Sequence, residues 1–174
     1  MGVTRKNLAL LLVTLAASGI WLGTSWGQGS PDPTFAPVSH TATATECAAC
    51  HMAYPAGLLP ARSWTRMMRE LENHFGEDAS LSPEETLTIT RYLTDNAADS
   101  PRANERSRRI AAGIGPGEAP LRFTETAYFR YLHDEVPSGV WKRAKIASRA
   151  NCIACHTRAD AGSFAEREIR IPKE

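Results

Sequence analysis

The sequence is poor in methionine, and its second half has none. Four methionines occur among 174 residues, and Met68 is the last of them along the chain. Methionine is one of the few side chains that bind iron or copper through sulfur. A metal site built from residues 69–174 therefore has no local methionine ligand.

Long uncharged stretches are equally scarce, and only residues 7–27 are long enough to span a bilayer. Arg5 and Lys6 precede this run, whose apolar centre gives way to small residues and a candidate cleavage site at Ser25-Trp26-Gly27. This order of charged, apolar and small residues predicts a secretory signal peptide over residues 1–27. An uncleaved anchor is the alternative. Either way we expect residues 28–174 to be exported to the periplasm, tethered to the membrane if the signal is kept.

Neither sign of charge is in large excess. Residues 1–27 hold two cations and no acids, which leaves 18 basic against 19 acidic residues in the remainder. This balance does not fit a nucleic-acid-binding protein. It conceals an asymmetry, because residues 28–100 hold 4 basic and 10 acidic residues whereas residues 101–174 hold 14 and 9. Opposite net charges of −6 and +5 indicate two modules or two docking faces.

Cysteine is rare too, but its placement is informative. All four cysteines fall into two C-x-x-C pairs, and a histidine follows each pair directly. The two motifs are Cys47, Cys50 and His51, and Cys152, Cys155 and His156. Disulfides are the common use of cysteine in an exported protein, and a single such motif could also serve zinc or redox chemistry. Two motifs of identical spacing that use every cysteine predict two covalently attached c-type haems.

The spacing within each motif matches the chemistry of haem attachment. Two thiols three positions apart on a helical turn lie on one face, where they can bond to the two vinyl groups of one porphyrin. The adjacent histidine then lies under the iron and supplies the proximal nitrogen, so we expect His51 and His156 to be proximal ligands. Covalent attachment also means that unfolding should not release either haem.

The sixth ligand of the second iron is expected to be His133. It is the only other histidine in residues 101–174, and that half has no methionine. Thr124 is a candidate N-cap for a helix that carries His133. The positions Phe129, Leu132, His133 and Val136 recur with the period of one helix face. A core histidine on an apolar face is the alternative reading of this pattern.

The first iron has more candidates. Pro60 precedes an expected helix, capped by Ser63 and ended by Gly76, that would carry His74 on its last turn. The apolar positions on its buried face are Trp64, Met67, Met68, Leu71 and Phe75. His74 falls on the same stripe at about 100° per residue, which makes it the preferred ligand. His40 and the two methionines remain alternatives, although the methionines are expected to pack in the core.

The pattern of the whole chain predicts a mainly α fold. Residues 28–45 are expected to be extended, and Ser82-Pro83 with Glu85 forms a strong helix start. Ser100-Pro101 could open a further helix that ends near Ala112, before a stretch rich in glycine and proline. We therefore place an N-terminal haem domain at residues 28–112 and a C-terminal haem domain at residues 113–174, both built of short helices and irregular loops. The second attachment motif is expected on a helix that ends near Gly162.

Several segments together resemble the dihaem cytochrome c family known as DHC. They are residues 46–54 (ECAACHMAY), 57–64 (GLLPARSW), 74–78 (HFGED), 140–141 (VW), 151–156 (NCIACH) and 162–164 (GSF). The resemblance covers most of residues 28–174. It implies one haem in each of two helical domains, with histidine on both sides of both irons, in agreement with His74 and His133.

The resemblance also implies a function. Family members look like electron donors to a small monohaem oxygen-binding cytochrome called SHP, and they often act alongside a membrane b-type cytochrome. We therefore expect an electron carrier rather than an enzyme, with no small-molecule substrate and no nucleic-acid partner. The small dihaem subunit of a periplasmic nitrate reductase is the main alternative, because that class also has two C-x-x-C-H sites and two histidines on each iron. A dihaem peroxidase is a weaker one, since it needs a five-coordinate iron.

The charge asymmetry leads to an expectation about docking. An acidic redox partner would meet the basic second half through Lys142, Arg143, Lys145 and Arg149, because complementary charge speeds encounter. The alternative is that these are solvated charges with no part in docking.

Overall fold

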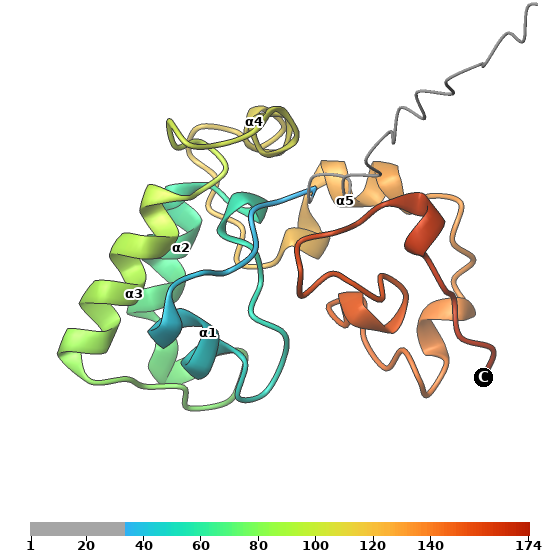
Figure 1. Cartoon of the computed structure of the whole chain (residues 1–174), viewed down its shortest axis with the longest axis horizontal. Helices are drawn as coiled ribbons and strands as arrows, with labels where there is room; N and C mark the ends of the chain where they lie inside the picture. The colour runs from blue at the N-terminus through green and yellow to red at the C-terminus, as the bar shows by residue number, and fades with distance from the viewer. Residues whose placement is uncertain (1–33) are drawn as a thin grey trace, which may run out of the picture. The chain divides into compact units, whose positions relative to one another are not determined.

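A computed structural model describes residues 34–174, and within this range the chain is mainly helical (Figure 1). The α-helices are α1 (Thr41–Cys47), α2 (Ala61–Arg69), α3 (Pro83–Asp95), α4 (Glu105–Ala112) and α5 (Ala127–Leu132). Short 3-10 turns lie at Ala56–Leu58, Leu71–Asn73, Phe123–Glu125, Val140–Lys142, Cys152–Ala154 and Glu166–Glu168. Over the same range, β-type pairing is limited to two isolated bridges, His74 with Glu77 and His156 with Ile169. The expected mainly α fold is confirmed.

The expected signal peptide, residues 1–27, lies outside the described residues. Among the helices of residues 34–174, none has the length and apolar character needed to cross a membrane.

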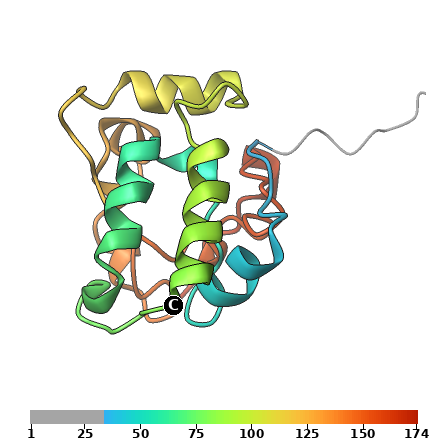
Figure 2. The same cartoon turned by 90° about the vertical axis from the view of Figure 1, so that its left-hand side faces the viewer.

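The main hydrophobic core forms between α2 and α3, which lie side by side (Figure 2). α2 contributes Trp64 and Met68, and α3 contributes Ile89 and Leu93, all of them buried. The Trp64 indole N–H donates to the carbonyl of Ala56 at 2.8 Å, which satisfies its one polar group inside the core. These contacts hold α2 in place on the path from the first cysteine motif to His74.

The start of α3 is the one the sequence predicts. Ser82 is the N-cap, its hydroxyl accepts from the backbone N–H of Glu85, and the Glu85 carboxylate accepts from the backbone N–H of Ser82. Pro83 occupies the first helical position, where its missing N–H costs nothing. Because all of these interactions are local, the sequence pattern was sufficient to locate them.

Other expected helix boundaries are wrong. α2 begins after Pro60 rather than at Ser63, which is buried inside the helix. α4 is capped by Asn104, and no helix opens at Ser100. α5 is capped by Thr126 instead of Thr124, and α1 begins at Thr41 inside the segment expected to be extended.

A second core cluster joins segments that are distant in the sequence. Phe35, Leu58, Ile110 and Ile114 are buried together, and Phe164 packs against them. The rings of Phe35 and Phe164 meet edge to face with centroids 5.5 Å apart, and the Phe35 backbone N–H donates to the Gly162 carbonyl at 3.0 Å. The described residues belong to one compact unit, and the division into domains at residues 112 and 113 stays a prediction.

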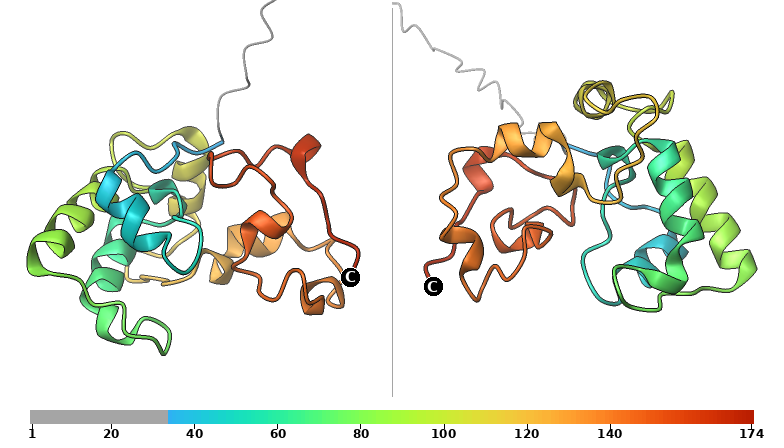
Figure 3. Two further views of the ribbon diagram at one scale, coloured as in Figure 1. Left: turned by 60° about the horizontal axis from the view of Figure 1, so that its bottom comes forward. Right: turned by 180° about the vertical axis from the view of Figure 1, so that it is seen from behind.

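The C-terminal third contains little regular structure. From His133 onward the chain follows an irregular path interrupted only by 3-10 turns (Figure 3). The second attachment motif begins on a single 3-10 turn, Cys152–Ala154, and the expected helix ending near Gly162 is wrong. Two long-range bonds support this region, from Arg143 Nη1 to the Pro172 carbonyl at 2.9 Å and from the Arg170 N–H to the Cys155 carbonyl at 2.8 Å.

Candidate functional site

The first cysteine motif lies at the end of a helix. α1 ends at Cys47, Cys50 lies in the turn that follows, and His51 comes directly after it. The His51 Nδ1 lies 2.7 Å from the carbonyl oxygen of Met52. When Nδ1 carries the proton and donates to that carbonyl, Nε2 is left with a free lone pair, as a metal-ligating histidine requires.

His74 faces His51 across a gap. Their ring centroids are 6.1 Å apart, and the ring planes differ by 28°. A metal–imidazole bond is about 2 Å long and a ring centre lies about 1 Å beyond its nitrogen, so two rings on opposite sides of one metal have centres about 6 Å apart. The separation of His51 and His74 therefore fits one iron between them.

The backbone brings His74 into place by an unexpected route. α2 ends at Arg69, and a separate 3-10 turn follows, so His74 is not on the last turn of α2 as the sequence predicted. The His74 N–H donates to the Glu77 carbonyl at 2.7 Å. Phe75 takes a left-handed conformation with φ 58°, which is uncommon for a residue with a side chain. This tight reversal, rather than a helix face, orients the His74 ring.

The surroundings of His74 are partly apolar and carry a positive charge. Met67, Phe75 and Leu121 line a cavity beside His74, and the Arg122 guanidinium lies over the Phe75 ring at 3.6 Å from its centroid. Burial lowers the pKa of His74, and the nearby His51 and Arg122 lower it further. A lowered pKa keeps the imidazole neutral, which is the form that binds a metal.

The second site repeats the arrangement with different local structure. Cys152 opens the 3-10 turn Cys152–Ala154, and Cys155 and His156 follow it. The ring centroids of His156 and His133 are again 6.1 Å apart, here with planes at 81°. Burial, and then proximity to His133, lowers the pKa of His156. This pair, too, has the separation of two ligands on one iron.

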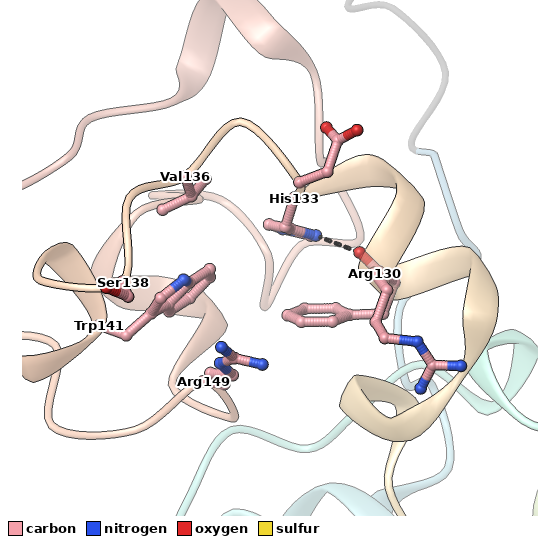
Figure 4. Close-up of a pocket in the computed structure, with 8 residues that line it drawn as sticks. Arg130, His133, Val136, Ser138, Trp141 and Arg149 are labelled. Atoms are coloured by element: carbon pink, nitrogen blue, oxygen red, sulfur yellow. Dashed lines mark hydrogen bonds between the residues drawn. The ribbon is translucent and has the colours of Figure 1, made fainter.

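His133 is held from the helix that precedes it. α5 ends at Leu132, so His133 is the residue that caps its C-terminus and not a position on a longer apolar stripe, and Leu132 is exposed. The His133 Nδ1 lies 2.9 Å from the Phe129 carbonyl oxygen, the contact drawn as a dashed line in Figure 4. The Phe129 and His133 rings stack with centroids 4.1 Å apart. Both contacts fix the orientation of the imidazole relative to α5.

A cavity of about 220 Å³ lies beside His133. Figure 4 shows His133, Trp141 and Arg149 around it, with Val136 at its edge. The Arg149 guanidinium lies 5.3 Å from the centre of the Trp141 ring system, so this wall combines an aromatic face with a positive charge. Such a lining suits a flat apolar ring system with anionic substituents, which is what a haem with its propionates presents.

Burial disfavours the thiolate form of the more enclosed cysteine in each motif, Cys47 and Cys152. Burial raises the pKa of the Cys152 thiol to about 11, and it also raises the pKa of Cys47. A thioether carries no charge, so burial does not oppose haem attachment as it opposes ionisation. Within residues 34–174, no three His, Cys, Asp or Glu side chains lie close enough together to hold a bare metal ion.

The alternative ligands considered for the first iron were His40, Met67 and Met68, and the structure places each of them in a different environment. His40 is the N-cap of α1, where its Nδ1 accepts from the Thr43 N–H at 3.4 Å, and its ring stacks on Tyr92 with centroids 5.2 Å apart. Met68 is buried in the α2 and α3 core, as expected. Met67 packs against that core and also borders the cavity beside His74.

Sequence reasoning assigned no role to several residues that the structure brings to the sites. Trp141 and Arg122 border the two histidine pairs, and the Tyr54 ring lies 4.9 Å from the His51 ring. Tyr54 and Trp141 were noticed only as parts of a family pattern. No local pattern in the sequence marked Tyr54 as a neighbour of His51.

Comparisons with known proteins agree with this arrangement. The model of the family described as dihaem cytochrome c matches residues 43–164. A diheme cytochrome c from Rhodobacter sphaeroides is 48% identical, with a TM-score of 0.67 over 74% of this chain and 99% of that one. A diheme cytochrome from Shewanella baltica is 38% identical, with a TM-score of 0.62 over 75% of this chain and 91% of that one. No curated protein matches the chain.

Proposed function

This chain belongs to the dihaem cytochrome c family, and from that premise we propose that it is a periplasmic electron carrier in which two histidines hold each iron. It carries two c-type haems, and its activity is electron transfer. Each haem supplies an iron that gains or loses one electron. The chain's own part is to attach the haems, orient the axial imidazoles and limit the access of water.

The observation that carries the proposal is the matched spacing of the two histidine pairs. In each pair the ring centroids are 6.1 Å apart, although the local backbone differs completely. We assign His51 and His74 to the first iron, and His156 and His133 to the second. The thioether bonds are assigned to Cys47 and Cys50, and to Cys152 and Cys155. Two imidazoles leave no open coordination position, and they favour a lower reduction potential than methionine ligation does.

The proposed partners follow from the family resemblance. The acceptor is a small monohaem oxygen-binding cytochrome of the SHP type, and the donor is a membrane b-type cytochrome. The N-terminal pattern of residues 1–27 supports export, with membrane tethering if that segment is kept. Neither a nucleic acid nor a small-molecule substrate is part of this function.

The test is spectroscopic and uses the oxidised, haem-loaded protein. Electron paramagnetic resonance should show two low-spin ferric haems, and a redox titration should show two one-electron steps. The red absorption band of methionine-ligated ferric haem should be missing. A high-spin ferric signal or that methionine band in the resting protein would contradict the ligand assignment.

The nitrate-reductase subunit remains the second candidate, because it too would have paired histidines on both irons. Purification from the native membrane and periplasm separates the two functions. A carrier should elute as a free small protein, whereas a subunit should elute with a large catalytic partner.

A further inference from the structure

Tyr54 contacts both haem attachment regions. Its ring lies against the imidazole of His51, with centroids 4.9 Å apart and planes at 32°. Its hydroxyl donates a hydrogen bond of 2.6 Å to the carbonyl of Ala150, which lies 96 positions further along the chain. Ala150 is two residues before Cys152. One side chain thus connects the proposed proximal ligand of the first iron to the backbone that leads into the second attachment motif.

The packing around Tyr54 holds this contact in place. Tyr54 packs against both hydrophobic core clusters, the one between α2 and α3 and the one that contains Phe35 and Ile110. Pro55, its neighbour in the chain, is fully buried. A side chain fixed between two packed clusters has few alternative rotamers, so its hydroxyl is kept within reach of Ala150.

The connection is short and continuous. It runs from the His51 imidazole to the Tyr54 ring, through the hydroxyl hydrogen bond to Ala150, and then along the backbone to Cys152. An electron can pass between two cofactors through the intervening atoms, and a route made of covalent bonds, a hydrogen bond and a ring contact has few gaps to cross. No other hydrogen bond in the described part of the chain joins residues 51–54 to residues 150–156.

We propose that Tyr54 is a positioning residue for electron exchange between the two haems, and that its hydroxyl bond to Ala150 sets the coupling between them. This inference rests on the proposed function, since it requires both irons to exchange electrons. One electron leaves the ferrous iron of one haem and reduces the ferric iron of the other. Tyr54 itself is neither oxidised nor deprotonated, and no bond is made or broken.

The test measures internal electron equilibration in the haem-loaded protein after pulse reduction of a fraction of the haems. Tyr54→Phe keeps the ring against His51 and removes only the hydroxyl. We expect equilibration to slow at least severalfold while both haems stay low-spin. Tyr54→Leu, which also removes the ring, should be at least as slow.

Tyr92→Phe is the matched control. Tyr92 also stacks on a histidine, His40, and its hydroxyl also binds the backbone, by accepting from the Ser39 N–H at 3.0 Å. It contacts neither attachment motif in these interactions, so its variant should equilibrate at the wild-type rate. If both tyrosine variants slow equally, general loosening is the cause and the proposal is wrong.

Two further outcomes separate this inference from the proposed function. A wild-type rate in Tyr54→Phe overturns the role of the hydroxyl, even if Tyr54→Leu is slow, and leaves the carrier function intact. A wild-type protein that accepts no electrons from a reductant and passes none to a second redox protein overturns both.

Discussion

The proposed iron ligands are not all held in place by the same kind of contact. His51 and His133 each bring Nδ1 to a nearby carbonyl oxygen, at 2.7 Å and 2.9 Å, which leaves Nε2 available to the metal. His74 is held instead by its backbone pairing with Glu77 and by the left-handed residue that follows it. His156 Nδ1 is buried, and no hydrogen-bond partner for it occurs within residues 34–174. A hydrogen bond at Nδ1 raises the basicity of a ligating imidazole. The proposed pairs His51–His74 and His133–His156 are alike in this respect, because one Nδ1 in each pair contacts a carbonyl oxygen.

Replacing His133 tests the second iron directly. In His133→Ala both haems should remain attached, because attachment depends on the cysteines alone. The second iron should become partly high-spin and, when reduced, should bind carbon monoxide. Optical and paramagnetic resonance spectra of the two oxidation states measure both effects.

His40→Ala serves as the control for that variant. His40 caps α1 and stacks on Tyr92, so its loss should leave both haems low-spin and closed to carbon monoxide. The opposite result, with an unchanged spectrum in His133→Ala and a high-spin haem in His40→Ala, would mean that His133 is a core histidine.

Helices and turns whose ends are set by neighbouring residues could be predicted from the sequence, whereas those that depend on residues distant in the sequence could not. The start of α3 is determined by Ser82, Pro83 and Glu85, which lie within four consecutive residues, and it was predicted. At the start of α2 the Asp99 carboxylate accepts from the Ala61 N–H at 2.8 Å across 38 positions, a contact that no local pattern reveals. Pro60 marked the place of this helix, but the cap was wrongly assigned to Ser63. The cysteine motifs could also be recognised from the sequence, because haem attachment requires two cysteines and a histidine at this fixed local spacing. The turn that orients His74 could not be predicted, since it depends on a left-handed phenylalanine.

The capping box of α3 gives a prediction about stability. Ser82→Ala should lower the free energy of unfolding by about 1 kcal/mol, because the first turn loses a hydrogen-bond acceptor. Hydrogen bonds from Ser82 lower the pKa of Glu85, so this support is present above the ordinary carboxyl pKa and is lost as the pH falls through the lowered value. Denaturant unfolding followed by circular dichroism should therefore show the deficit at neutral pH and a smaller one in acid. An equal deficit at both values would contradict the role of Glu85.

The junction at Gly162 gives a second prediction at this scale. Gly162 has φ 75°, and a Cβ there would lie 2.1 Å from the Phe35 carbonyl oxygen. Gly162→Ala should therefore destabilise the protein by more than about 1 kcal/mol. Gly117→Ala is the matched control, because nothing lies within 4 Å of its Cβ position. Thermal unfolding of the two variants should separate them clearly, and equal melting temperatures would show that Phe35 moves aside without cost.

For the whole molecule, the excess of basic residues in the second half includes a group of cations between residues 142 and 149. Lys142, Lys145 and Arg149 are exposed, so they can face a partner. Arg143 is half-buried and donates to the Pro172 carbonyl, which ties it to the C-terminal tail. The exposed cations lie close in sequence to Trp141, which borders the second site. A basic surface at that position would bring an acidic partner near the second haem.

Charge reversal on this surface tests whether it steers a partner. The double variant with Lys142→Glu and Lys145→Glu should slow electron transfer to an acidic monohaem cytochrome, and the difference from the wild type should shrink as salt screens the charges. Stopped-flow kinetics across ionic strength measure both effects. Arg91→Glu, an exposed site on α3, is the control and should change the rate little. A wild-type rate that does not vary with salt would show that these charges play no part in docking.

The contact between Phe35 and Gly162 also has a consequence for the order of events during synthesis. A ribosome makes residue 35 long before residue 162, so Phe35 has neither its backbone partner nor its ring partner, Phe164, until nearly the whole chain exists. Closing so long a loop also follows local helix formation, because its entropic cost comes before its contacts are gained. Cys47 and Cys50 are therefore made well before the two ends can meet. A haem joined to Cys47 and Cys50 at that stage would meet a chain in which Phe35 still lacks its contacts with Gly162 and Phe164.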